Sequence, residues 1–350
     1  MSSDDPAVAG WDVQVAGHLC VDLVPGLLDA VDVTPGRLIQ VGPLDVRLGG
    51  CVANTGADLA ALGLRALLVT SLGDDVLAAS VAALIDAIPG ADARVETVPG
   101  ATTSYSIVVQ PPETDRAFWH HVGANAHFDG RQVDVAAAPL LHVGYLPLLP
   151  RLIAQVGAEL VRLFEQARSA GVTTSIDMSV VQPGRSDVDW TELLTRVLPL
   201  CDVVSPSLDD IRSVLVRSGL DAGEAADWLL ERGAAVVAVS DGPRGVVVRT
   251  AEARRFTRGS QSTLLAALPA SWHSRQVEVS AAPVPVVETT GAGDAATAAL
   301  LAAVHSGMSL DPGLELVQSA AAHRVAGLGS LATLQGGLTS RQTESDERKS

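Results

Sequence analysis

The region between residues 140 and 239 alternates between short apolar runs and longer segments with helical periodicity. The apolar runs cover 140–143, 172–177, 203–204 and 235–239, and the helical segments cover 152–170, 191–198, 208–217 and 222–232. Strands and helices that alternate in this way pack as a parallel sheet with helices on both faces. The sequence therefore predicts an α/β fold around such a sheet.

The amino-terminal part of the chain contains β-type segments that do not fit this alternation. Residues 11–24 have the pattern of a buried first strand. Residues 27–48 are divided by Pro, Gly and Asp into pieces as short as edge strands, and 102–110 and 117–122 are β-type runs joined by a hairpin-like connection. We expect these pieces to pair as a small second sheet.

Composition limits the partners that such a fold can have. Apolar residues make up 47% of the 350, which is enough for a large buried core. The net charge is −16 and Lys349 is the only lysine, so nucleic acid and acidic membrane surfaces are not expected partners. A bound nucleotide would have to be held by backbone amides, helix N-termini, arginines and Mg²⁺.

The cysteines and the termini predict a soluble cytoplasmic protein. Cys20, Cys51 and Cys201 are widely spaced and form no CxxC pattern, which is typical of reduced thiols. Residues 1–10 are acidic and small and lack the features of a signal peptide, and no apolar stretch is long enough to span a bilayer. We expect 1–10 to be flexible and the polar residues 335–350 to form a disordered tail.

A glycine-rich string near the carboxyl end carries the clearest chemistry. Gly291-Ala292-Gly293-Asp294 follows an extended segment and precedes a helical run at 295–305. Free N–H groups and the helix dipole favour phosphate at such a position, and a neighbouring carboxylate can accept a hydroxyl proton during phosphoryl transfer. Taken alone, the string also fits a helix cap after a glycine turn.

The string has companions upstream in a fixed order. Asp22 ends the first apolar run, and Gly49-Gly50 precedes Asn54 at the start of a helical stripe. Each of these alone also suits a turn or a helix cap. Together with residues 289–294 they resemble the signatures of the ribokinase-like, or phosphofructokinase B, family of carbohydrate kinases over roughly residues 11–332.

This resemblance implies a fold and a catalytic centre. The fold would be a three-layer α/β/α sandwich over residues 11–334 with a small β-sheet lid from about 27–48 and 100–125. Asp294 would be the general base, and the amides of Gly291, Ala292 and Gly293 would stabilise the developing charge. The residues implied to bind the substrate are Asp22, Gly49, Gly50, Asn54, Arg116 and Asn125.

The resemblance also implies a nucleotide site and its ions. The residues implied to bind ATP are Ser207, Ser240, Gly242, Arg244, Gly245, Thr290 and His323. Asp210 stands where the family has a glutamate that organises Mg²⁺, and Glu288 stands where some members have an acidic residue of a monovalent-cation site, so K⁺ is a further expected ion. A cap on the following helix is the alternative role of Ser207.

The expected function is transfer of the ATP γ-phosphoryl group to a sugar hydroxyl. The alternative is a catalytically weak member that binds a sugar or nucleoside as a sensor, because Ser207, Asp210 and Glu288 depart from the family pattern. Cys20 replaces an asparagine that touches the sugar in ribokinase, which argues against assuming ribose. The histidines lack zinc-ligand spacing and are assigned to no metal. A homodimer through the lid edges is expected.

Overall fold

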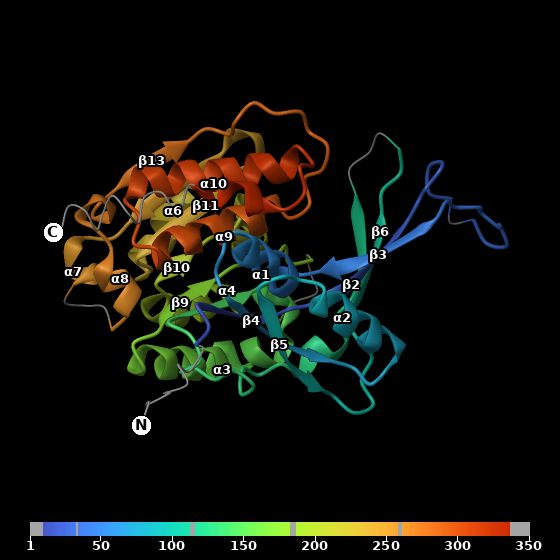
Figure 1. Cartoon of the computed structure of the whole chain (residues 1–350), viewed down its shortest axis with the longest axis horizontal. Coiled ribbons are helices and arrows are strands. Elements are labelled where there is room, and N and C mark those ends of the chain that lie inside the picture. The colour runs from blue at the N-terminus through green and yellow to red at the C-terminus, as the bar shows by residue number, and fades with distance from the viewer. Residues whose placement is uncertain (1–9, 33, 113–115, 183–186, 258–260, 337–350) are drawn as a thin grey trace, which may run out of the picture.

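The computed structural model describes residues 10–32, 34–112, 116–182, 187–257 and 261–336. Most of the expected flexible amino-terminus (1–10) and disordered tail (335–350) lies outside these residues. Nine strands of the described part form one twisted sheet (Figure 1). Their spatial order is β13 (Gln276–Val279), β12 (Val246–Thr250), β11 (Val236–Ser240), β10 (Val203–Val204), β9 (Thr173–Ile176), β8 (Leu140–Gly144), β1 (Val13–Gly17), β4 (Ala66–Leu72) and β5 (Ala91–Thr97).

The sheet is parallel from β11 to β5, and only β12 and β13 pair antiparallel at one edge. This mainly parallel arrangement follows from the strand–helix alternation, because each helix returns the chain to the same end of the sheet. The carboxyl ends of the parallel strands therefore meet at one edge, where α/β proteins bind their ligands.

Helices cover both faces of the sheet and bury two apolar clusters against it. One face carries α1 (Cys51–Ala61), α2 (Val76–Asp86), α7 (Ala253–Phe256), α8 (Thr263–Ala267), α9 (Ala292–His305) and α10 (Leu310–Val325). The other carries α3 (Pro150–Ser169), α4 (Trp190–Val197), α5 (Leu208–Leu215) and α6 (Ala222–Glu231). The predicted three-layer α/β/α sandwich is confirmed. Within the described residues no helix is long and apolar enough to cross a membrane.

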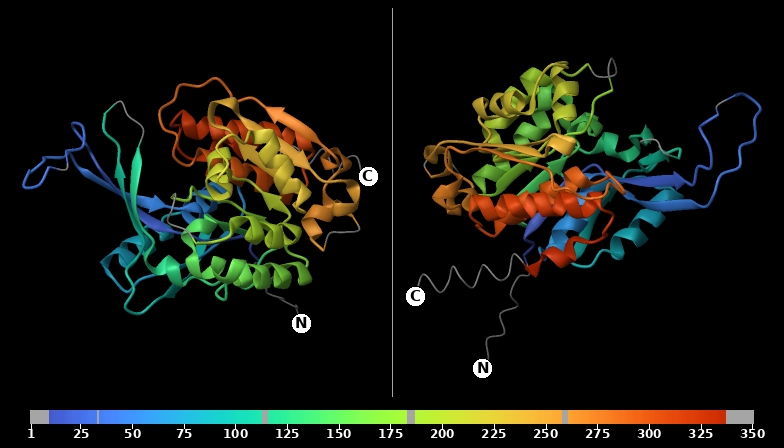
Figure 2. Two further views of the ribbon diagram at one scale, coloured as in Figure 1. Left: turned by 180° about the vertical axis from the view of Figure 1, so that it is seen from behind. Right: turned by 90° about the horizontal axis from the view of Figure 1, so that it is seen from above.

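A separate four-stranded sheet extends from the body of the molecule (Figure 2). Its order is β3 (Leu44–Gly49), β2 (Cys20–Pro25), β6 (Tyr105–Val109) and β7 (Ala117–His121). We call this sheet the lid. It contains the predicted second sheet and one strand more, because β2 also belongs to it.

Two expectations about these strands were wrong. The run 11–24 is not one strand, because the chain leaves the main sheet after Gly17 and enters the lid at Cys20. Residues 38–41, one of the short pieces of 27–48 that resembled edge strands, form no strand. In the described part of that segment the only strand is β3. An apolar run identifies buried backbone but not the sheet in which that backbone pairs.

Strand register aligns a row of polar side chains across the lid. Asp22 of β2 pairs with Arg47 of β3 on one side and with Ser106 of β6 on the other. Ser106 in turn pairs with His120 of β7. Directly paired residues project from the same face of a sheet, so this row belongs to a single lid face.

Candidate active site

Asp294 lies in the first turn of α9 with its side chain buried. The helix begins after Gly291, whose φ of 74° suits a residue without a Cβ atom, and Asp294 is only 3% exposed. Its Oδ2 accepts hydrogen bonds from Nδ2 of Asn54 at 3.0 Å and from the Tyr145 hydroxyl at 2.9 Å. Its Oδ1 accepts one from Oγ1 of Thr55 at 3.1 Å. Two segments far apart in the chain therefore orient this carboxylate.

Burial and hydrogen bonding act on Asp294 in opposite directions. Burial raises the pKa of Asp294, while the hydrogen bonds from Asn54, Tyr145 and Thr55 and the charge of Arg324 lower it. Burial is the larger effect, so the carboxyl group binds a proton more readily than an ordinary aspartate. A raised proton affinity is what a general base needs in order to accept a proton near neutral pH.

A cavity of about 180 Å³ lies between the lid and the body, and its lining includes Asn54, which donates to Asp294. The lid contributes side chains from β2, β3, β6 and the approach to β7, and the body contributes α1, α10 and the segment before α9. The lining residues are Asp22, Val24, Arg47, Leu48, Asn54, Val108, Gln110, Arg116, Phe118, Glu288, Thr290, Gly291 and Arg324. Six residues that the sequence analysis assigned to the site share this one cavity: Asp22, Asn54, Arg116, Glu288, Thr290 and Gly291.

Gly49 and Gly50 let the lid approach the start of α1. A Cβ at position 49 would lie within 2.4–2.5 Å of the Asp22 carboxylate, and a Cβ at position 50 would lie 2.5 Å from Nδ1 of His18. The φ of 86° at Gly50 adds a second requirement for glycine. A side chain at position 49 would therefore displace Asp22 from the cavity wall, and one at position 50 would collide with His18.

Asn125, a predicted substrate-binding residue, does not line the cavity. It lies in the short 3₁₀ helix η1 (Gly123–His127) and is fully buried. Its Nδ2 donates to the carbonyl of Leu19 at 2.8 Å, and its Oδ1 accepts from Oγ1 of Thr70 at 3.5 Å. The amide thus holds the main chain where it passes from β1 into the lid. The sequence places Asn125 close to Arg116, but it does not show that the Asn125 side chain is buried in η1.

The segments predicted to bind the nucleotide meet at the carboxyl ends of β10 and β11. Ser207 forms an isolated parallel bridge with Ser240. Ser207 also caps α5 in a capping box with Asp210, whose Oδ2 accepts from Ser207 N at 2.9 Å and from its Oγ at 2.6 Å. The capping alternative for Ser207 therefore holds, and Asp210 is oriented by that cap.

The turn after β11 is shaped by its glycines and an ion pair. Gly242 begins the 3₁₀ helix η4 (Gly242–Arg244), and Gly245 has a φ of 99° and packs so closely on the carbonyl of Val279 that no side chain fits. Arg244 donates to both carboxylate oxygens of Asp241 at 2.6 and 2.7 Å. The guanidinium is thus held beside this exposed turn.

Two further acidic residues lie close to Asp294. Asp177 follows β9 and is buried, and its pKa is raised well above the usual value by burial and by the charges of Asp210 and Asp294. Burial likewise raises the pKa of Asp210. Asp177 was not among the residues predicted for the site, although it is the last residue of a predicted strand, a common position for a functional carboxylate in this type of sheet.

Arg324 of α10 is a cation of the site that the sequence analysis missed. It pairs closely with the buried carboxylate of Asp58 and lines the cavity, and a Cβ at Gly291 would meet its side chain at 3.8 Å. His323, the neighbour that was predicted to adjoin the nucleotide, precedes it on the same helix. Glu288 faces Arg47 across the cavity at 3.5 Å.

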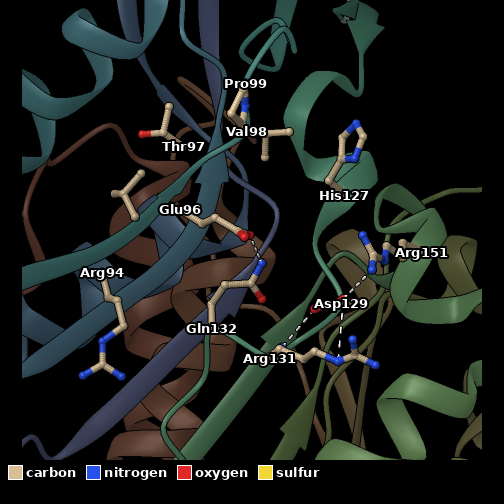
Figure 3. Close-up of a pocket in the computed structure, with 11 residues that line it drawn as sticks. Arg94, Glu96, Thr97, Val98, Pro99, His127, Asp129, Arg131, Gln132 and Arg151 are labelled. Atoms are coloured by element: carbon tan, nitrogen blue, oxygen red, sulfur yellow. Dashed lines mark hydrogen bonds and ion pairs between the residues drawn. The ribbon is translucent and has the colours of Figure 1, made fainter.

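A second cavity, of about 470 Å³, lies away from Asp294 beside β5 (Figure 3). Arg131 and Arg151 flank the buried carboxylate of Asp129, and Gln132 pairs with Glu96. None of the residues assigned to the active site lines this cavity. The smaller cavity beside Asp294 is therefore the candidate active site.

Comparison with known proteins agrees with this geometry. Residues 12–335 match the pfkB family of carbohydrate kinases, and the chain belongs to that family. It is 29% identical over 317 residues to a 1-phosphofructokinase of Rhodobacter capsulatus, covering 88% of this chain and 86% of the relative. It is 25% identical over 335 residues to the bifunctional protein HldE of Caulobacter vibrioides, covering 93% of this chain but only 62% of that protein.

The fold has solved relatives as well. The structure of an Arabidopsis thaliana ribokinase complexed with ribose and ATP aligns with a TM-score of 0.68 over 95% of this chain and 98% of that one, at 19% sequence identity. At this identity the likeness concerns the fold. The predicted family and the predicted ribokinase-like architecture are both confirmed.

Proposed function

We propose that the protein transfers the γ-phosphoryl group of ATP to a hydroxyl group of a sugar or sugar derivative, with Asp294 as general base. The observation that carries this proposal is the buried, hydrogen-bonded carboxylate of Asp294 at the amino-terminus of α9, beside a cavity lined by Asp22 and Asn54. A carboxylate of raised proton affinity next to a polar cavity suits proton removal from a hydroxyl group.

The reaction follows from these positions. As the acceptor oxygen attacks the γ-phosphorus, its proton passes to Asp294, and the bond between the γ-phosphorus and the bridging oxygen of ADP breaks. The amides of Gly291, Ala292 and Gly293 lie at the positive end of the α9 dipole, where negative charge is favoured. Arg324 adds a full positive charge beside them.

The nucleotide would extend from this helix terminus towards Ser207 and Ser240, which adjoin at the ends of β10 and β11. Mg²⁺ prefers carboxylate oxygens and phosphates. Asp177 and Asp210 could hold it. Both are buried, and the negative charge of Asp210 adds to the effect of burial in raising the pKa of Asp177. A cation between the two carboxylates would relieve their repulsion. When bound, Mg²⁺ would neutralise phosphate charge.

The charges on the cavity wall favour an acceptor that carries an anionic group. Three arginines, Arg47, Arg116 and Arg324, line the cavity with two carboxylates, Asp22 and Glu288, so positive side chains are in excess. Each guanidinium has five N–H donors, so one that is anchored by a protein partner can still bind a ligand oxygen. Phosphorylated hexoses and sugar acids are therefore the first acceptors to test, followed by neutral ketoses, aldoses and nucleosides.

The test is ADP release from Mg-ATP across that panel of acceptors. The proposal expects at least one acceptor to give ADP in proportion to phosphorylated product. The sensor alternative expects acceptors to bind, as seen by thermal shift, without ADP release above the rate without acceptor. Binding without turnover throughout the panel would therefore reject the kinase proposal in favour of the sensor.

A further inference from the structure

Two histidines and a cysteine meet where the lid joins the body. His18 lies between β1 and β2, Cys20 begins β2, and His120 lies on β7. Their ligand atoms all lie within 4.8 Å of one another, and this is the one cluster of its kind in the described part of the chain. His18 and Cys20 are buried, and His120 is half-buried.

Folding of the lid brings Cys20 and His120 together beside His18. His18 and His120 are 102 residues apart, so their sequence spacing shows no relation between them. His120 reaches Asp22 through the cross-strand row, and Cys20 lies two residues before Asp22 on the same strand and therefore on the same lid face. Two of the scattered histidines, His18 and His120, thus lie next to each other in the fold.

The distance between the two histidines matches that of a tetrahedral zinc site. The two Nε2 atoms of His18 and His120 are 3.3 Å apart. Zinc–nitrogen bonds of about 2.0–2.1 Å at tetrahedral angles put two ligand nitrogens roughly 3.3–3.4 Å apart. The ligand atom of each histidine lies within 4.8 Å of Sγ of Cys20, and this thiol donates to Oδ1 of Asp22 at 3.4 Å.

The surroundings of His120 prepare it for coordination. Nδ1 of His120 lies 3.0 Å from Oγ of Ser106, a contact that leaves Nε2 to face the cluster.

We propose that His18, Cys20 and His120 bind a zinc ion as its three protein ligands. Binding converts the Cys20 thiol to a thiolate and releases its proton to solvent. Nitrogen and sulfur donors together select zinc over magnesium or calcium, which take oxygen ligands. The ion would connect β7 of the lid to the segment that follows β1.

The site adjoins the cavity through Asp22. If Asp22 orients the acceptor, as the proposed function holds, zinc would act on its carboxylate through Cys20, because the thiol that donates to Oδ1 of Asp22 would become a zinc-bound thiolate. Loss of this hydrogen bond, together with the hold of zinc on the lid, would then inhibit phosphoryl transfer. This consequence rests on the proposed function, whereas zinc binding itself does not.

The direct test is metal binding by the full chain. Cobalt(II), which replaces zinc in such sites, gives a near-ultraviolet thiolate-to-metal absorption band when a cysteine is a ligand. We expect one cobalt ion per chain with this band, displaced by one equivalent of zinc. The band should be lost in Cys20→Ser, and zinc affinity should fall more than about 100-fold in Cys20→Ser and His120→Asn.

A matched control is His127→Asn, because His127 is exposed and lies outside the cluster. It should bind zinc as the wild type does. No thiolate band in the wild type, or wild-type zinc affinity in His120→Asn, would overturn the proposal. Should Cys20→Ser fail to fold, the half-exposed His120 position decides the outcome, since its replacement removes a ligand with less disturbance of the core.

Inhibition is measured separately. Zinc should lower ADP release by the wild type and not by His120→Asn, at acceptor concentrations near KM. Zinc binding without inhibition would retain the metal site and reject its link to Asp22. Absence of any turnover concerns the kinase proposal only, because the cobalt band does not depend on activity.

Discussion

The hydroxyl group of Tyr145 donates a 2.9 Å hydrogen bond to the same carboxylate oxygen of Asp294 that accepts from Asn54. Tyr145 has a left-handed backbone conformation, with a φ of 57°, and its ring stacks on His18. Tyr145 is thus a strained residue held between His18 and the proposed base, which suggests that its position matters for the chemistry.

Tyr145→Phe should shift the pH dependence of phosphoryl transfer. The hydrogen bond from Tyr145 lowers the pKa of Asp294, so its removal raises that pKa. The base works in its deprotonated form, and the acid limb of kcat/KM therefore moves to higher pH. A hydrogen bond to a charged group contributes about 1.5–3 kcal/mol, which corresponds to a shift of about one to two pH units.

The control for this shift is Tyr105→Phe, which changes the other tyrosine of the chain, on β6 of the lid. Its pH profile should match that of the wild type. An acid limb that stays in place in Tyr145→Phe would show that this hydrogen bond does not tune the base.

Arg116→Gln should weaken the binding of an anionic acceptor more than that of a neutral one. Arg116 lines the cavity from the lid and donates to Oγ1 of Thr289 at 2.6 Å. Loss of one charge-assisted hydrogen bond should raise KM for an anionic acceptor about 10- to 100-fold. The measurement is the ratio of KM values for a sugar phosphate and its neutral parent. An unchanged ratio would contradict the proposal that the cavity arginines favour an anionic acceptor.

Potassium should activate the enzyme relative to sodium. The backbone N–H of Glu288 donates to the carbonyl of Val325 at 3.2 Å, so this residue adjoins the end of α10, just before the glycine-rich segment 327–330. Its side chain also faces Arg47. Rates at fixed Mg-ATP with KCl or NaCl at equal ionic strength test the expectation, and equal rates would contradict it.

The lid should mediate a homodimer. Strands β3 and β7 are its edges, and apolar side chains lie exposed on or near it, including Leu38 at 92% and Trp119 at 52%. Exposed strand edges and apolar groups favour association. Light scattering should give twice the 36.0 kDa mass of the chain, and Leu38→Glu should reduce it. A wild-type mass of one chain would contradict the expectation.

Periodicity predicted most of the main sheet. The helices that alternate with β8 to β11 were predicted within two residues of their observed bounds. Strands β5, β12 and β13 were not predicted. β5 and β13 carry exposed, charged side chains at the edges of the sheet, where the apolar pattern is weak.

The candidate site residues that the sequence predicted are those that belong to short motifs. Asp294, Asn54 and Asp22 belong to contiguous strings, so their residue types and spacing indicated a role. Tyr145 and Arg324 reach Asp294 and the cavity through tertiary packing of η2 (Leu146–Leu148) and α10, and no local pattern distinguishes them from ordinary core or surface residues. The cluster of His18 and His120 needed the lid register for the same reason.

The central claim is that Asp294 is the base for phosphoryl transfer. Asp294→Asn keeps the size of the side chain and can still accept from Asn54 or Thr55, but it cannot take a proton. Removal of a general base costs about two to four orders of magnitude in rate.

The most direct measurement is therefore acceptor-dependent ADP release by Asp294→Asn and by the control Asp86→Asn, an exposed acid at the end of α2. We predict that kcat falls at least about 100-fold in Asp294→Asn, with acceptor binding retained, and stays at the wild-type value in Asp86→Asn. A folded Asp294→Asn variant that turns over at the wild-type rate would contradict the account.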